Sequence, residues 1–217
     1  PKMIRLCLTG DVMTGWGIDQ VLQVPFDPDL YESSIHDART YVKLAEDRTG
    51  PIPHPVADDY IWGAALEAMA RREPNAWGAA PDRPGVNFLS TITPAKARQV
   101  AEHIALHCDH KDVVVASIRW GENRGYEVPD LHRSFAHELI DAGPVDIVHG
   151  HSSHHPKGIE FHRGKPIIYG CGDLINDYEG ISGYETYQSH LSLLYFIDVD
   201  PDSREIQKME LVPMRMS

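Results

Sequence analysis

Four histidines follow one short apolar run in the second half of the chain. The run Val145–Val148 leads into a Gly/Ser-rich loop that carries the imidazoles of His149, His151, His154 and His155. Neutral imidazole binds transition metals, and its unperturbed pKa of about 6.5 lets it carry protons at physiological pH. A strand that ends in such a loop predicts metal ligands or proton carriers at a sheet edge. The alternative is a solvated polar loop.

A carboxylate follows another strand-like run near the N-terminus. Gly10 and Asp11 come shortly after the run Ile4–Leu8, so a residue without a side chain stands where two backbones can approach closely. Asp11 can serve as a hard metal ligand, a general base or a helix N-cap. Two strand ends that present an acid and a cluster of histidines together predict one site.

Two further loops carry residues that can bind a substrate. Arg119 and Arg124 can grip a carboxylate or phosphate through a planar fork of donors, unless they pair with structural acids. In the same loop, Trp120 and Tyr126 can pack against a substrate ring or chain. The loop after Pro166–Tyr169 carries polar groups that either orient the histidines or form a solvated acidic turn: Asp173, Asn176, Asp177 and Glu179.

The composition predicts a globular protein without affinity for polyanions. The 217 residues fit a single domain over 1–217, and the net charge of −12 argues against non-specific binding of nucleic acid or anionic lipid. Cys7, Cys108 and Cys171 form no CxxC pair, which argues against a disulfide framework or a zinc ribbon. No apolar run reaches the ~18 residues of a membrane span, and a strand begins too early for a signal peptide. We therefore expect a reduced, cytoplasmic protein.

Strands and helices alternate in the middle of the sequence. Strands are expected at Ile4–Leu8, Asp112–Ser117, Val145–Val148, Pro166–Tyr169, Leu191–Val199 and Ile206–Val212. Helices are expected at Asp58–Arg71, from Thr93-Pro94 to about His107, and at Leu131–Asp141 with Gly143 as the C-cap. This order predicts an α/β protein with mixed sheet layers flanked by helices. Gln23–Pro55 is expected to be a long surface excursion, and Glu73–Gly85 a loop.

The sequence resembles the CapA family of capsule and poly-γ-glutamate synthesis proteins, which have a calcineurin-like metallophosphatase fold. The resemblance extends from the first strand to Val212. It rests on four short motifs: Gly10-Asp11-Val12-Met13, Ile118-Arg119-Trp120-Gly121, Gly150-His151-Ser152-Ser153-His154 and Tyr169-Gly170-Cys171-Gly172-Asp173.

The resemblance implies a two-metal centre that this sequence only partly retains. Asp11, His151 and His154 match metal ligands of the superfamily, with Mn, Fe or Zn as the expected ions. The family segments that supply the other ligands are absent, and the apparent junction lies near residues 75–76. Arg119 stands where the family has a histidine, and a guanidinium repels a dication. The remaining set is a poor match for two metals ~3.5–4 Å apart.

This depletion favours acid–base chemistry without a cofactor. The family has a branch of peptide epimerases found with lasso-peptide biosynthesis, which invert an α-carbon of a ribosomally made precursor. Such a reaction needs two proton carriers across a pocket, with Arg119 available to stabilise the intermediate. We expect Asp11 to pair with His190, which replaces an acidic stretch of the family, or with His151 or His154.

Three hypotheses follow from the sequence. The first is a metal-independent peptide epimerase that uses Asp11 and a histidine and takes a peptide as its substrate. The second is a metal-dependent phosphoesterase or a poly-γ-glutamate synthesis enzyme of the CapA family. The third is a binding module that has kept the fold and lost the activity.

Overall fold

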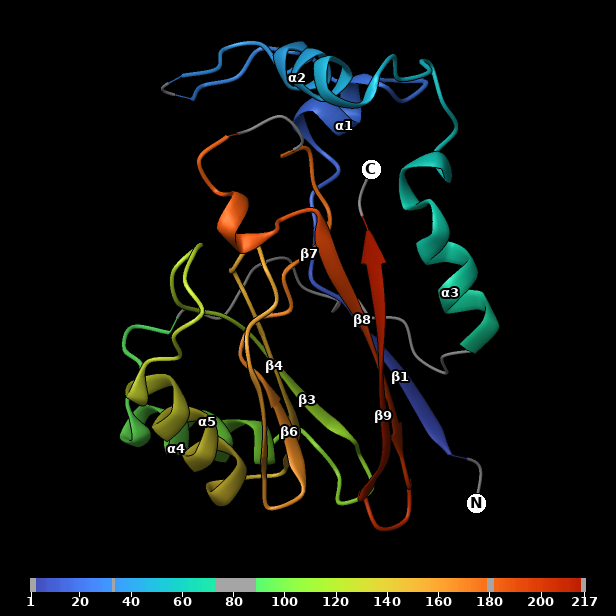
Figure 1. Ribbon diagram of the computed structural model, residues 1–217. Coiled ribbons are helices and arrows are strands. Elements are labelled where there is room, and N and C mark those ends of the chain that lie inside the picture. The colour runs from blue at the N-terminus through green and yellow to red at the C-terminus, as the bar shows by residue number, and fades with distance from the viewer. Residues whose placement is uncertain (1–2, 33, 73–88, 179–181, 216–217) are drawn as a thin grey trace.

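Two β-sheets lie face to face at the centre of the computed structural model, which describes residues 3–32, 34–72, 89–178 and 182–215 (Figure 1). Their strands are β1 (Ile4–Leu8), β3 (Val114–Arg119), β4 (Val145–His151), β5 (Ile159–His162), β6 (Lys165–Ile168), β8 (Leu191–Val199) and β9 (Ile206–Arg215). One sheet has the order β3-β4-β6-β5, with β3, β4 and β6 parallel and β5 antiparallel. The other is antiparallel, in the order β1-β8-β9.

Helices cover the outer faces of both sheets, so the molecule has four layers. Helices α4 (Pro94–Ala105) and α5 (Asp130–Ala142) pack on the four-stranded sheet through a core that includes Phe135, Leu139 and Val148. On the opposite side, α3 (Ala64–Arg72) packs on the three-stranded sheet.

Strand β8 shows why this layering forms. Leu194 and Phe196 face α3, whereas Tyr195, Ile197 and Val199 face the other sheet, as the period of two in a strand requires. All five side chains are at most 2% exposed, so β8 is covered on both faces.

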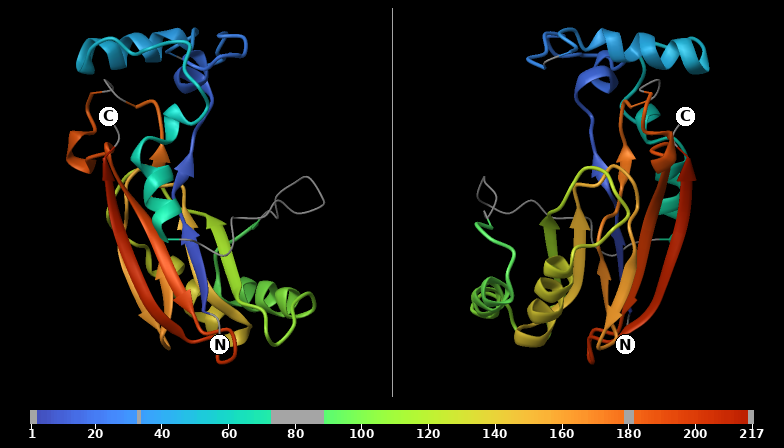
Figure 2. Two further views of the ribbon diagram at one scale, coloured as in Figure 1. Left: turned by 90° about the vertical axis from the view of Figure 1, so that its right-hand side faces the viewer. Right: turned by 60° about the vertical axis from the view of Figure 1, so that its left-hand side comes forward.

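A short parallel pair and two helices lie over one end of the two sheets. Strand β2 (Asp11–Val12) pairs with β7 (Asp173–Ile175), and α1 (Trp16–Gln20) and α2 (Arg39–Thr49) follow above them. Figure 2 shows α2 lying across the top of the molecule, above the ends of β7 and β8. Two single 3₁₀ turns complete the elements, η1 (Tyr60–Trp62) and η2 (Glu185–Tyr187). We call α1, α2 and η1 together the cap.

Several expected elements are confirmed and others need correction. β1 and β8 have the expected bounds, and Thr93 Oγ1 caps α4 by accepting a hydrogen bond from Lys96 N at 3.2 Å. The helix expected over Asp58–Arg71 is divided, because Gly63 has a φ of 47° between η1 and α3. Gln23–Pro55 is not only an excursion, since it contains α2.

The fold agrees with the expected class, a mixed α/β protein whose sheet layers are flanked by helices. The apparent junction at residues 75–76 and the acid Glu179 lie outside the described residues. Within the described part of the chain, none of the helices is both long and apolar enough to cross a bilayer.

Candidate acid–base site

Asp11, His151 and Arg119 meet where three strands begin or end. Arg119 closes β3 and His151 closes β4, and the two residues are register partners in the parallel pair. Asp11 opens β2 and points to both of them. His151 Nδ1 lies 3.2 Å from Asp11 Oδ1, and an Arg119 guanidinium nitrogen lies 3.6 Å from Asp11 Oδ2. The structure therefore brings together three of the residues that the sequence predicts for a site.

The two contacts keep Asp11 ionised. The His151 imidazole is the main cause that holds the pKa of Asp11 below its ordinary value, and Arg119 adds to the effect against the opposing influence of burial. His151 Nδ1 lies within 3.2 Å of the carboxylate but does not meet the angles of a hydrogen bond to it. The contact between the two groups is therefore mainly electrostatic. Asp11 and His151 are largely buried, whereas the Arg119 side chain is 64% exposed. The guanidinium can therefore reach a ligand from the solvent side.

The backbone around the site is tightly constrained. A Cβ on Gly10 would lie 2.0 Å from the Gly172 carbonyl oxygen, so only glycine lets β2 approach β7 and place Asp11 there. Ser152, directly after His151, has a φ of 116°, which is rare for a residue with a side chain. Strain of this kind persists where the surrounding structure enforces it, and it is frequent at functional sites.

His149 is held in position through both ring nitrogens. Its Nε2 donates to the Thr9 carbonyl oxygen at 2.8 Å, and its Nδ1 lies 3.0 Å from the Ser117 hydroxyl. Because a carbonyl only accepts, the ring carries its proton on Nε2 and Nδ1 accepts from Ser117. Burial is the main cause that lowers the pKa of His149. The residue is a neutral support for the site.

His154 belongs to a second, more deeply buried pair. Its Nδ1 lies 3.0 Å from Asp173 Oδ2, and Asn176 donates to the same oxygen at 2.7 Å. The Asp173 side chain is fully buried, and His154 Nε2 faces the Tyr178 hydroxyl at 3.5 Å. Since Asp173 is the register partner of Asp11, the two acid–histidine pairs are neighbours.

The predicted substrate-binding residues divide into exposed and buried groups. Tyr126 is 54% exposed, and Arg124 lies over the Tyr184 ring at 4.2 Å while donating to Ser189. Trp120 is only 5% exposed, and its indole N–H donates to the Tyr169 carbonyl oxygen. The expectation that Trp120 packs against a substrate is at odds with this burial, because the ring is part of the core beneath α5.

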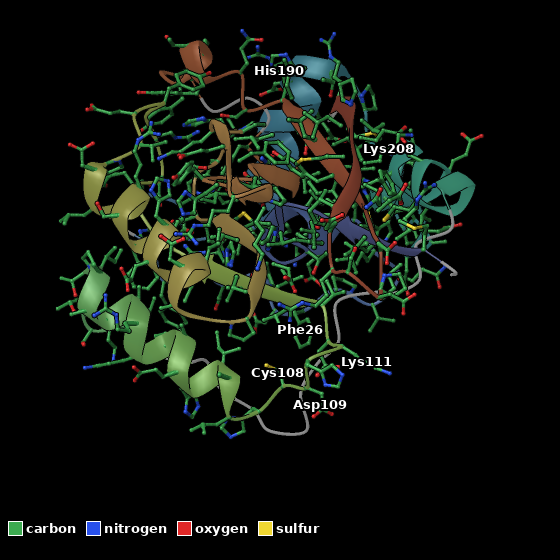
Figure 3. All side chains as sticks on the ribbon, turned by 90° about the horizontal axis from the view of Figure 1, so that it is seen from below. Phe26, Cys108, Asp109, Lys111, His190 and Lys208 are labelled. Atoms are coloured by element: carbon green, nitrogen blue, oxygen red, sulfur yellow. The ribbon has the colours of Figure 1, made fainter. Side chains whose placement is uncertain are left out.

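His190 does not join the Asp11 cluster. It lines a cavity beneath the cap whose walls include neither Asp11 nor His151 nor His154. Figure 3 places His190 at the opposite edge of the molecule from Cys108 and Asp109 in the loop before β3. Among the described residues, Asp11 and His190 make no contact with each other. The structure therefore does not support the hypothesis that they act as a facing pair.

The geometry also bears on the two-face mechanism. Inversion of an α-carbon needs proton carriers on opposite faces of that carbon. Asp11 and His151 are in direct contact, at 3.2 Å, so a substrate carbon has no room between them. The pair instead resembles a carboxylate that orients an imidazole, with the second ring nitrogen available for proton transfer.

Two polar residues of this region lie outside the set predicted from the sequence. They are Ser117, which contacts His149, and Tyr178, which contacts His154. The signal for Ser117 is its place near the end of a parallel strand, where it lies beside its register partner His149.

The donor set does not fit a pair of metal ions. Within 3–32, 34–72, 89–178 and 182–215, no group of three His, Cys, Asp or Glu side chains converges as a metal site. The Arg119 guanidinium already lies on one Asp11 oxygen, and both nitrogens of His149 are engaged. A dication beside Asp11 would meet this positive charge at close range.

Comparison with known proteins connects these observations to a family. The family model described as bacterial capsule synthesis protein PGA_cap matches residues 59–178. A protein of Mycobacterium tuberculosis (strain CDC 1551 / Oshkosh) described as a probable polyglutamine synthesis accessory protein is 32% identical, over 100% of this chain and 86% of its own length. Its counterpart in strain ATCC 25618 / H37Rv, described in the same words, gives the same identity and coverage.

The alignment with these relatives spans 330 positions, whereas this chain has 217 residues, so about a third of the positions have no counterpart here. The place of the junction stays a prediction. Neither relative is named for a lasso peptide or an epimerase. From the full-length identity and the family match, the chain belongs to the PGA_cap family of bacterial capsule synthesis proteins, the CapA family that its motifs resemble.

Proposed function

We propose that this protein takes part in the synthesis of a capsule-type polymer of glutamate units, and that it acts on the polymer at the cluster of Asp11, His151 and Arg119. The observation that carries the proposal is the contact between a buried carboxylate and an imidazole, with an exposed guanidinium beside them. The choice of polymer is supported by the match to a family of capsule synthesis proteins and by relatives described as probable polyglutamine synthesis accessory proteins.

The reaction that suits this arrangement is acid–base hydrolysis of an amide bond of the polymer. The Asp11 carboxylate faces the Nδ1 side of His151 and orients the ring. Among the described residues His151 Nε2 forms no hydrogen bond, so it can remove a proton from the attacking water and return it to the leaving nitrogen. Arg119 binds a side-chain carboxylate or the developing oxyanion. No step in this scheme needs a metal ion.

The direct test is incubation of the purified protein with poly-γ-glutamate, with the new chain ends measured by an amine-reactive dye. We expect new ends that form equally well with and without a strong chelator. Asp11→Asn and His151→Asn should each reduce the rate at least about 100-fold. Asp202→Asn, on the exposed β8–β9 turn, is the matched control and should keep the rate of the wild type.

The possible outcomes separate the hypotheses. Cleavage that is abolished by the chelator and restored by Mn²⁺ would contradict the metal-free scheme and favour the metal-dependent alternative. Equal rates in the wild type and in Asp11→Asn would remove Asp11 from the reaction.

A further inference from the structure

A cavity with a volume of about 670 Å³ lies between the cap and the ends of β7 and β9. Figure 1 shows the elements that surround it, with α1 and α2 above, α3 to one side and β7 and β9 below. Most of the lining is apolar, from Ile18, Val42, Trp62, Leu174 and Met214 among others. A cavity of this size and character can enclose a small molecule.

Polar and charged residues also line the cavity. They include Asn176, Asp177, His190 and Arg215. Asp177 is 7% exposed, and its Oδ2 accepts a hydrogen bond from the Gly17 amide at 2.8 Å. Its Oδ1 is shielded from solvent and has no hydrogen-bond partner within the part of the chain that the structure describes.

The Asp177 carboxylate also has no cationic partner. Across the described ranges, no arginine, lysine or histidine lies within ion-pair distance of it, and the nearby Glu32 and Asp173 are acids. A buried carboxylate without a counter-charge is costly, because it has lost water and received in return only backbone N–H groups, those of Gly17 and of Asp177 itself. Burial accordingly raises the pKa of Asp177 to about 6.

We propose that this cavity binds a small ligand that combines an apolar body with a protonated primary amine, whose ammonium group meets Asp177. The apolar walls would enclose the body, and the ammonium would supply both the missing donor for Oδ1 and the missing positive charge. Because Oδ1 is shielded from solvent, the carboxylate must turn about its Cβ–Cγ bond to meet the ligand, and the hydrogen bond from the Gly17 amide to Oδ2 restrains that turn. Since Asp11, His151 and His154 do not line the cavity, this site is separate from the one proposed for polymer chemistry.

Three probes of the same shape test the proposal, namely benzylamine, benzyl alcohol and benzoate. Each is titrated into the full chain at pH 7.5 and followed by calorimetry or by NMR of the protein. Benzylamine should bind about tenfold or more tightly than benzyl alcohol, and benzoate should bind least. Equal affinities for the three probes, or no saturable binding of benzylamine at millimolar concentration, would overturn the proposal.

Two variants and a control locate the binding. Asp177→Asn should reduce the affinity for benzylamine to that for benzyl alcohol, whereas Asp202→Asn should leave it unchanged. Ala45→Phe fills the cavity from α2 and should abolish the binding of all three probes. If Asp177→Asn is folded and still prefers benzylamine, the amine is bound elsewhere and the assignment is wrong. Polymer cleavage is independent of these results, so failure here leaves the proposed function standing.

Discussion

His149 Nε2 donates a hydrogen bond to the backbone carbonyl oxygen of Thr9 over 2.8 Å. This contact joins β4, which carries the histidine loop, to the turn that carries Asp11. Ser117 on β3 completes the link through His149 Nδ1 at 3.0 Å. The three segments that form the site are thus fixed to one another by a histidine that does not itself contact Asp11.

We expect His149 to remain neutral with its proton on Nε2 at pH 6.5. Its burial disfavours the charged ring, so its pKa is lowered, and the Thr9 carbonyl selects the tautomer. Protein with ¹⁵N-labelled histidine would show the imidazole shifts of this form by NMR. A protonated His149 at that pH, or a proton on Nδ1, would contradict the account.

Replacement of Gly10 by alanine should destabilise the protein strongly. The new Cβ would lie 2.0 Å from the Gly172 carbonyl oxygen and 2.5 Å from the Gly172 carbonyl carbon, and both of these Gly172 atoms belong to the backbone. We expect a loss of about 2 kcal/mol or more in the free energy of unfolding, measured by urea denaturation. Gly15→Ala meets nothing within 4 Å and should change stability by less than about 0.5 kcal/mol. Similar values for the two variants would mean that β2 and β7 are not as close as described.

The sequence predicts most of the fold wherever apolar spacing or capping chemistry is strong. β8 could be placed because its apolar residues face two cores, and α4 because Thr93-Pro94 is a clear start signal. β2 and β7 are two and three residues long, too short to show a period. α2 is not predicted from the sequence, because it is mostly polar and buries only Tyr41 among its residues.

The location of the candidate site could be predicted from strand ends. Which acid contacts which histidine could not be predicted in this way. Parallel neighbours bring Arg119 and His151 together, and the glycine before Asp11 signals a close approach. His190 lies directly before β8, and no local pattern encodes that the cap packs over this strand end and that His190 lines the cavity beneath it. Trp120 follows the same strand end as Arg119, yet its ring turns into the core, where the Tyr169 carbonyl accepts its N–H.

The stability of the protein should depend on pH through Asp177. Burial raises its pKa from 3.8 to about 6, so between these values the folded protein binds a proton more readily than the unfolded chain. The contribution of Asp177 to stability therefore falls as the pH rises through this window, by up to about 1.4 kcal/mol per pH unit. The asparagine in Asp177→Asn does not titrate, so the variant lacks this dependence of stability on pH.

The measurement is urea denaturation of the wild type and Asp177→Asn at pH 4 and pH 7. The variant should gain about 2 kcal/mol relative to the wild type over this range. A difference between the two proteins that is constant with pH would show that Asp177 is not held in a raised-pKa environment.

Arg119→Met should weaken polymer binding more than it slows the reaction. Arg119 is exposed and lies at the solvent side of Asp11, which suits a group that holds a substrate carboxylate. We expect KM for poly-γ-glutamate to rise about tenfold while kcat changes less than about threefold. Arg98→Met, which removes a surface pair with Glu138 on α5, should alter neither constant. A fall in kcat with KM unchanged would instead assign Arg119 to stabilisation of the transition state.

Asp11 and His151 should transfer protons during cleavage of a glutamate polymer by water, and incubation in ¹⁸O-labelled water tests this. Poly-γ-glutamate is incubated with the protein in this water together with a chelator, and the masses of the products are measured by mass spectrometry. The account predicts one ¹⁸O atom in each new carboxyl end for the wild type, formed at least about 100-fold more slowly by Asp11→Asn. Unlabelled polymer from the wild type, or the same labelling rate in Asp11→Asn, would contradict it.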